Sequence, residues 1–100
     1  MKYNKLVRDK IPKKLDDKNV KYKIHTADEK EYEEKLREKL QEEVSEFMQD
    51  SNVEELADIL EVVYALCDLY NIDKENLEKT RQSKAEEKGT FQNKIILEES

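Results

Sequence analysis

The sequence predicts a mostly α-helical protein, an antiparallel helical bundle built on a central helix hairpin. Residues 28–49 and 52–70 carry apolar side chains at intervals of three and four, which is the spacing of one buried helix face. The chain has one glycine and one proline, too few for the many turns of an all-β domain. A length of 100 residues suits a single domain, and we expect it to cover residues 1–100.

Capping residues set the boundaries of the first helices. Pro12 suits the first turn of a short helix that reaches about residue 18, because its missing N–H has no partner to lose there. Asp28 can cap the first long helix, since its carboxylate accepts an unpaired backbone N–H. Ser51 or Asn52 can cap the second long helix in the same way, so the hairpin turns at these residues.

The rest of the chain is predicted to form one more helix and two short strands near the termini. Asp73 caps a helix over residues 74–88, and Gly89 ends it. Apolar and charged residues alternate over residues 20–24, which indicates a half-buried strand. The apolar part of segment 91–97 is expected to form a second strand beside it.

The composition excludes several classes of protein. Charged residues make up 44% of the chain, and a net charge of −6 does not attract nucleic acid or an anionic membrane. No apolar run approaches the roughly 20 residues that span a bilayer, and the first residues do not resemble a signal peptide. One cysteine and one histidine cannot build a zinc site or a Cys–His nucleophile pair. We therefore expect a soluble, cytoplasmic protein that binds neither nucleic acid nor membrane.

Acidic residues fall on the apolar faces of both long helices when these are wound at about 100° per residue. The apolar stripe of the first long helix is formed by Tyr32, Leu36, Leu40, Val44 and Phe47. Glu43 falls inside this stripe and Glu46 at its edge. The stripe of the second long helix is centred on Leu56, Ile59, Leu60, Val63 and Cys67. Glu55 and Asp58 lie along the apolar edge of that second stripe.

The hairpin could bring these four carboxylates together. Glu43 and Glu46 stand one turn apart on one helix, and Glu55 and Asp58 stand one turn apart on the other. Unpaired carboxylates in one place repel each other and lose hydration, so cations must neutralise them. An all-oxygen cluster suits Mg²⁺, with Mn²⁺ as a substitute. The sequence therefore predicts a divalent-cation site.

One other interpretation of these acids remains open, and a second is disfavoured. With 25 acidic residues, some glutamates fall beside an apolar stripe by chance and simply extend their charge into solvent. A di-iron bundle also uses inward carboxylates, but its site needs histidines in the helices. The single histidine, His25, lies outside both long helices, and we expect it on the surface.

The acidic pattern resembles that of a known family. Glu42-Glu43-x-x-Glu46 followed by Glu55-x-x-Asp58 resembles the signature of the MazG-like all-α nucleoside triphosphate pyrophosphohydrolases. The resemblance implies Mg²⁺-dependent cleavage between the α- and β-phosphates of a nucleotide, with release of pyrophosphate and a role in removing unwanted nucleotides. The family's metal ligands correspond to Glu43, Glu46, Glu55 and Asp58. Either Glu46 or Glu42 is expected to orient or deprotonate the attacking water.

The two ends of the chain are similar to a subgroup of that family, the phosphoribosyl-ATP pyrophosphohydrolase-like proteins. The similarity covers the string YNKLVRDKIP at residues 3–12 and the segments 81–84 and 88–97. A polyphosphate substrate needs cationic side chains as well as metal ions. The candidates for substrate binding are Arg8, Arg81, Lys84 and Lys88.

The alternatives to an enzyme are a helical dimerisation or interaction module, and a degenerate relative that binds a nucleotide without hydrolysing it. The interaction module would show no effect of Mg²⁺ on its melting temperature and no turnover of any nucleotide. In all three cases a chain this small leaves about 40% of its unfolded surface exposed. We therefore expect a homo-oligomer, either a dimer or a tetramer.

Overall fold

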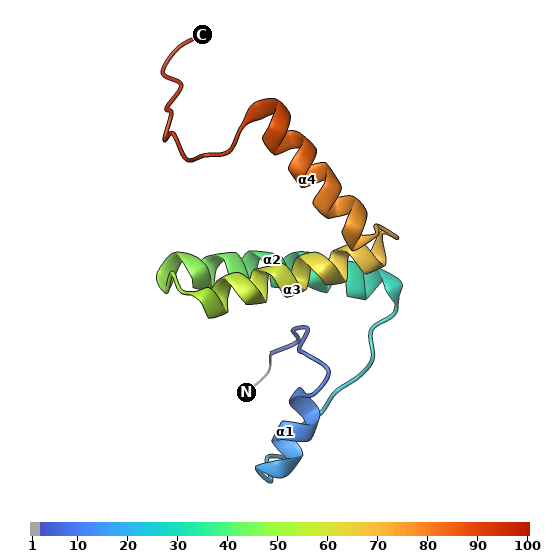
Figure 1. Ribbon diagram of the computed structural model, residues 1–100. Helices are drawn as coiled ribbons and strands as arrows, with labels where there is room; N and C mark the ends of the chain where they lie inside the picture. Colours follow the sequence, from blue (N-terminus) through green and yellow to red (C-terminus); the bar gives the residue numbers. More distant parts are fainter. Residues whose placement is uncertain (1–2) are drawn as a thin grey trace.

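The computed structural model describes residues 3–100, and this part of the chain folds into helices joined by loops (Figure 1). The helices are α1 (Ile11–Asp17), α2 (Glu29–Gln49), α3 (Val53–Leu69) and α4 (Lys74–Lys88). The predicted mostly α-helical fold is confirmed, and every predicted helix lies close to its expected bounds. Within residues 3–100, no helix is both long enough and apolar enough to cross a membrane.

The predicted capping residues begin the three longer helices. The side chains of Asp28, Asn52 and Asp73 each accept a backbone N–H of the first turn, at 2.9, 2.9 and 3.0 Å. Asn52, and not Ser51, is therefore the cap of α3, while the Ser51 hydroxyl donates to the carbonyl of Phe47 at 3.0 Å. These caps satisfy N–H groups that the helices themselves cannot pair, and so fix where α2 ends and α3 begins.

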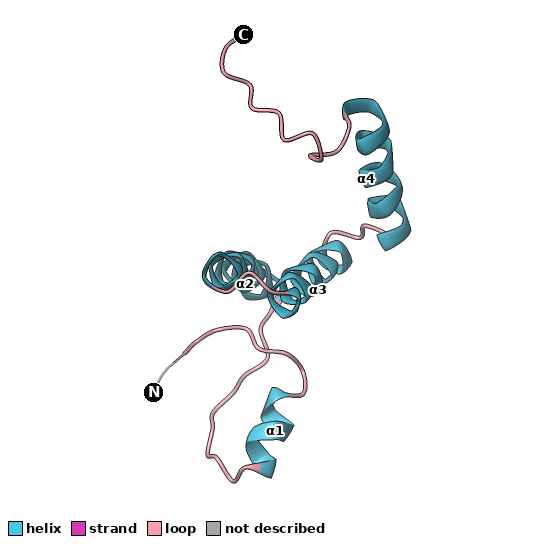
Figure 2. Cartoon of the chain, turned by 60° about the vertical axis from the view of Figure 1, so that its left-hand side comes forward, coloured by secondary structure: helices cyan, strands magenta, loops and turns pink. Residues whose placement is uncertain are grey.

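Helices α2 and α3 pack side by side as an antiparallel hairpin at the centre of the molecule (Figure 1 and Figure 2). Leu36 of α2 is buried in this hairpin, and so are Val62 and Cys67 of α3. The core is narrow because a pair of helices covers only one face of each partner. The hairpin is thus the element that positions any site between α2 and α3.

The remaining segments lie on either side of the hairpin. Residues 3–10 and α1 lie on one side, and α4 extends from the opposite side and leads into the C-terminal segment 89–100 (Figure 1 and Figure 2). Gly89 ends α4 with a φ of 86°, a conformation that glycine adopts without strain. The described chain is accordingly elongated, with extents of 56 × 31 × 24 Å.

The prediction of two short strands is wrong for the described residues. Segments 20–24 and 91–97 have no strand conformation, and their apolar side chains are exposed. A strand needs a neighbour to pair its backbone groups. These two segments follow α1 and α4, which lie on opposite sides of the hairpin, so neither can provide the other's partner (Figure 1).

The buried face of α3 also differs from the predicted one. Leu56 and Leu60 were expected at the centre of the buried stripe, but both are about half exposed. Val62, which lies further round the helix, is buried instead. Helix α3 is apolar around much of its circumference, and α2 covers only the side that faces it. Leu56, Leu60 and the exposed Val53 therefore form an uncovered apolar surface on α3.

Candidate metal centre and the adjoining cleft

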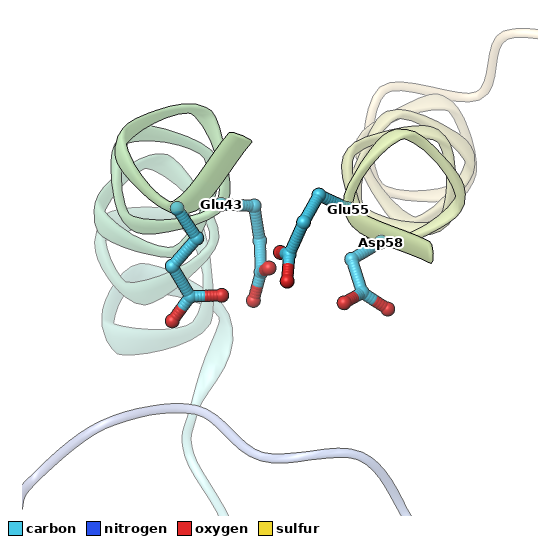
Figure 3. Close-up of side chains that lie close together, drawn as sticks. Glu43, Glu55 and Asp58 are labelled. Atoms are coloured by element: carbon cyan, nitrogen blue, oxygen red, sulfur yellow. The ribbon is translucent and has the colours of Figure 1, made fainter. Parts of the chain in front are cut away.

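The hairpin brings the four predicted metal ligands together. Each of Glu43, Glu46, Glu55 and Asp58 offers a carboxylate oxygen, and these oxygens all lie within 4.8 Å of one another. Figure 3 shows Glu43 and Glu55 meeting in the space between the two helices, with Asp58 beside them. The turn at residues 50–52 causes this meeting, because it places the end of α2 next to the start of α3. These four residues are called the acidic cluster below.

One member of the acidic cluster is buried, and two of its oxygens lack partners. Glu43 is only 6% exposed. Within residues 3–100, Oε2 of Glu43 and Oε2 of Glu55 are buried and accept no hydrogen bond. An unsatisfied buried carboxylate oxygen is costly, so buried charges in proteins are paired or bind metal ions. The two oxygens are therefore candidate ligands for a cation.

The environment of Glu43 raises its pKa from the ordinary value of 4.5. Burial is the largest cause, followed by the hydrogen bond and the charge of Glu46. Lys39 opposes this shift, since its Nζ lies 3.4 Å from Oε1 of Glu43. The net effect is that Glu43 holds a proton more readily than an exposed glutamate does.

The donor set of the acidic cluster fits a hard divalent cation. Carboxylate oxygens are the protein ligands that Mg²⁺ and Mn²⁺ prefer, whereas zinc sites favour nitrogen and sulfur. The partnerless oxygens of Glu43 and Glu55 are the structural observation that agrees with such an ion. The cluster could therefore hold a metal through its four carboxylates.

Glu42 lies outside the acidic cluster, although it is adjacent to Glu43 in sequence. Its carboxylate accepts from Nζ of Lys39 at 2.9 Å and from Nζ of Lys5 at 3.1 Å. The hydrogen bond from Lys39 is the largest cause that lowers the pKa of Glu42. Of the two carboxylates considered for the attacking water, Glu46 belongs to the cluster, whereas Glu42 is linked to it only through Lys39, which pairs with both Glu42 and Glu43.

A cleft of about 580 Å³ opens beside the acidic cluster, within the usual size range of small-molecule sites. Residues 6–11 and Lys14 form one wall, and the hairpin forms the other, which includes Glu43 and Asp58. The cationic side chains that line it are Arg8, Lys10, Lys14, Lys39 and Lys74. A single cavity thus adjoins both the carboxylates and a set of positive charges.

Arg8 is the predicted substrate-binding residue that the structure brings to the acidic cluster. Its Nη2 donates to Oδ1 of Asp58 at 2.7 Å. The N-terminal segment that carries it passes below the carboxylates in the view of Figure 3. Arg8 is therefore both a lining residue of the cleft and an ion-pair partner of a candidate metal ligand.

The other three predicted substrate-binding residues lie elsewhere in the described chain. Arg81, Lys84 and Lys88 stand on α4, which extends away from the hairpin, and none of them lines the cleft (Figure 1). The guanidinium of Arg81 pairs with Glu78 on the same helix, at 2.6 Å. The three residues do lie on one helix, as predicted, but within one chain this helix does not bring them to the acidic cluster.

Sequence reasoning missed three lysines that line the cleft. Lys39 had a signal, because its position four residues before Glu43 places the two side chains on one helix face. Lys14 and Lys74 had no local signal, since only the packing of α1 and of the start of α4 brings them to the cleft. Nζ of Lys74 lies 4.6 Å from the centre of the Tyr64 ring, which also lines the cleft.

The functional interpretation depends on the acidic cluster and on the cleft beside it. The cluster could hold a divalent cation, and cationic and acidic side chains both line the cleft next to it. The chain matches no protein-family model, no curated protein and no solved structure.

Proposed function

We propose that the protein is a Mg²⁺-dependent pyrophosphohydrolase of the MazG-like kind. Its substrate would be a nucleoside triphosphate or a phosphoribosyl-ATP-like nucleotide, cleaved between the α- and β-phosphates, and its role the removal of unwanted nucleotides. The observation that carries the proposal is the acidic cluster, in which buried oxygens of Glu43 and Glu55 have no partner within residues 3–100. Five cationic side chains that line the cleft beside the cluster support a phosphorylated substrate, although acidic side chains line the same cleft.

The exposure of each residue in the cluster suggests its role in the proposed reaction. Glu43, Glu55 and Asp58 are buried or half-buried, which suits ligands that hold Mg²⁺ in a fixed position. Bound Mg²⁺ would neutralise phosphate charge and activate water for attack on phosphorus. Glu46, the exposed member of the cluster, would be the fourth ligand, and its exposure suits a residue that also orients that water and accepts its proton.

The test is an assay of pyrophosphate release. A panel of nucleoside triphosphates and phosphoribosyl-ATP is incubated with the protein, with and without Mg²⁺. We expect Mg²⁺-dependent release from at least one substrate, and a loss of about a hundredfold or more in Glu55→Gln. Glu54→Gln is the matched control, because Glu54 precedes Glu55 in the same helical turn but belongs neither to the cluster nor to the cleft. Equal turnover by the two variants would refute the site.

A second candidate is a helical interaction module without enzymatic activity. The uncovered apolar residues favour it, above all Phe91, which is 97% exposed, and the three residues at 95–97. This candidate requires that Mg²⁺ leave the melting temperature unchanged and that no nucleotide be hydrolysed. A relative that binds a nucleotide without cleaving it would instead bind Mg²⁺ and the nucleotide but release no pyrophosphate.

We also propose that the protein assembles as a homo-oligomer, either a dimer or a tetramer. The hairpin buries a narrow core, and Leu56 and Leu60 on α3 remain about half exposed. A second copy could cover these residues and the C-terminal segment without any other partner. The oligomer and the enzyme are independent proposals, because a dimer can form whether or not the cluster binds a cation.

A further inference from the structure

Arg8 occupies a position that a bound cation would contest. Its guanidinium donates at 2.7 Å to Asp58, which is one of the four candidate metal ligands. We infer that a divalent cation displaces Arg8 from Asp58, and that the released guanidinium then binds phosphate oxygens of the ligand in the cleft. This exchange rests on the proposed metal site, and it would make phosphate binding by Arg8 depend on metal binding.

The contact between Arg8 and Asp58 is weak enough to be exchanged. The Arg8 side chain is 56% exposed and that of Asp58 is 38% exposed, so solvent screens the pair. Such a surface ion pair changes an equilibrium constant by only about two- to fivefold. A divalent cation in contact with Asp58 also repels the guanidinium, because both carry positive charge. The carboxylate therefore favours one cationic partner at a time.

The segment that carries Arg8 can follow such an exchange. Residues 3–10 have no helix, and the hydrogen bonds that the structure forms between this segment and the hairpin are two ion pairs. One joins Arg8 to Asp58 and the other joins Lys5 to Glu42, which lies outside the acidic cluster. Loss of the first pair leaves the second to hold the segment over the cleft.

The released guanidinium has a suitable destination. Arg8 lines the cleft together with Lys39 and Lys10, so it remains beside any phosphorylated ligand bound there. Arginine presents a planar fork of N–H groups that matches two phosphate oxygens at once. Once the cation has displaced Arg8 from Asp58, the negatively charged phosphate provides a new partner for the guanidinium. Metal loading therefore prepares Arg8 to bind the phosphate.

The exchange predicts shifts of opposite sign in two binding measurements. In titration calorimetry with Mn²⁺ alone, Arg8→Gln should bind about two- to fivefold more tightly than the wild type, because the competing cation is gone. With inorganic pyrophosphate and excess Mg²⁺, the same variant should bind about tenfold more weakly, because a charge-assisted hydrogen bond is lost. Arg8→Lys should keep wild-type Mn²⁺ binding and restore part of the pyrophosphate affinity.

Lys13→Gln is the matched control for the loss of one positive charge. Lys13 lies near Arg8 on the same side of the hairpin, but it pairs with Asp17 and does not line the cleft. We expect wild-type values in both titrations, and circular dichroism should show the same helix content in all variants.

The outcomes separate the exchange from the proposed function. A wild-type protein that binds no Mn²⁺ overturns both. If the wild type binds Mn²⁺, opposite shifts in Arg8→Gln support the exchange. Any other pattern overturns the exchange and leaves the proposed metal site unaffected. One such pattern is an Arg8→Gln variant that binds both Mn²⁺ and pyrophosphate more weakly, which is the result expected if Arg8 only stabilises the structure.

Discussion

Glu43 lies in the core of the hairpin, where a charged carboxylate is unfavourable unless a positive partner shares it. Helical winding places this residue inside the apolar stripe, and the structure confirms its burial. Lys39 reaches only one of its oxygens, and the other has no partner among residues 3–100. If the proposed cation binds, it would supply a positive partner for that second oxygen.

The first prediction concerns the stability of the protein in EDTA at pH 7. Glu43→Gln keeps the shape of the side chain and removes the charge that faces Glu46 and Glu55. Relief of that buried charge should raise the free energy of unfolding by about 1 kcal/mol, or the melting temperature by roughly 5 °C. Thermal unfolding followed by circular dichroism measures the change. A variant less stable than the wild type would mean that the Glu43 carboxylate is satisfied as it stands.

The second prediction concerns the pH dependence of that difference. Because the folded protein raises the pKa of Glu43 above 4.5, protonation of Glu43 favours the folded state. This contribution is complete below about pH 4.5 and is lost as the pH rises through the raised pKa. The melting temperatures of the wild type and Glu43→Gln in EDTA should therefore converge at pH 4 and separate towards pH 7.

Comparison of the two proteins isolates Glu43 in this experiment. The surrounding charged groups, which are Lys39 and Glu46 on α2 and Glu55 and Asp58 on α3, are the same in both proteins. A difference in melting temperature that stays constant between pH 4 and pH 7 would contradict the raised pKa.

At the scale of the elements, the pairing of α2 with α3 determines whether the site exists. The acidic pairs come from different helices, so a cation bound to all four carboxylates ties the helices together. Ligand binding to the folded state alone stabilises it by mass action. The metal site is therefore also expected to stabilise the hairpin.

The third prediction follows from that link. Mg²⁺ at about one hundred times its dissociation constant should raise the free energy of unfolding by about 2.7 kcal/mol, which is roughly 14 °C in melting temperature. Glu55→Gln should lose most of this increase, and Glu54→Gln should retain it. Differential scanning fluorimetry with and without Mg²⁺ provides the measurement. An equal response of both variants would place the cation outside the cluster.

The fourth prediction concerns the cap of α3. Asn52→Ala removes the side chain that accepts the N–H of Glu55 and should cost about 1 kcal/mol of stability. Because the same turn aligns Glu55 with Glu43, the variant should also bind Mn²⁺ more weakly. Ser51→Ala is the neighbouring control, since Ser51 does not cap α3. If Ser51→Ala proves the more damaging change, the cap has been assigned to the wrong residue.

Local chemistry made much of this fold predictable from the sequence. Capping side chains act within one turn of the helix, so Asp28 and Asp73 reveal helix starts without any tertiary knowledge. The acidic cluster was predictable for a similar reason, because a short turn leaves the two acidic pairs on neighbouring helices. Their role as metal ligands remains a prediction.

The features that depend on distant contacts were not predictable. Residues 20–24 alternate like a strand, but a strand forms only with a partner, and none lies beside them in the described chain. Leu56 satisfies the helical period as well as Val62 does, so only the position of α2 decides which is buried. Arg81 shares a face with Lys84, yet the direction of α4 decides what that face meets.

At the scale of the whole molecule, the described chain is too extended for its length. Its radius of gyration is 17.7 Å, whereas a compact domain of 100 residues has about 13 Å. The excess comes from α4 and from segment 89–100, which extend beyond the hairpin (Figure 1). Residues 95–97 are each about 80% exposed although they are all apolar. A surface of this kind is typical of a protein–protein contact.

The fifth prediction is that a second copy of the chain covers this surface. Sedimentation velocity should show a dimer or tetramer at micromolar concentration. Replacement of Ile95, Ile96 and Leu97 by serine removes about 1.5 kcal/mol or more of apolar burial per residue, so the dissociation constant should rise by about a hundredfold or more. Replacement of Lys94 and Glu98 by serine is the matched control, because it changes the adjacent polar residues and keeps the apolar ones. A wild type that stays monomeric would contradict the prediction, and equal weakening of the oligomer by both replacements would mean that the contact is not apolar.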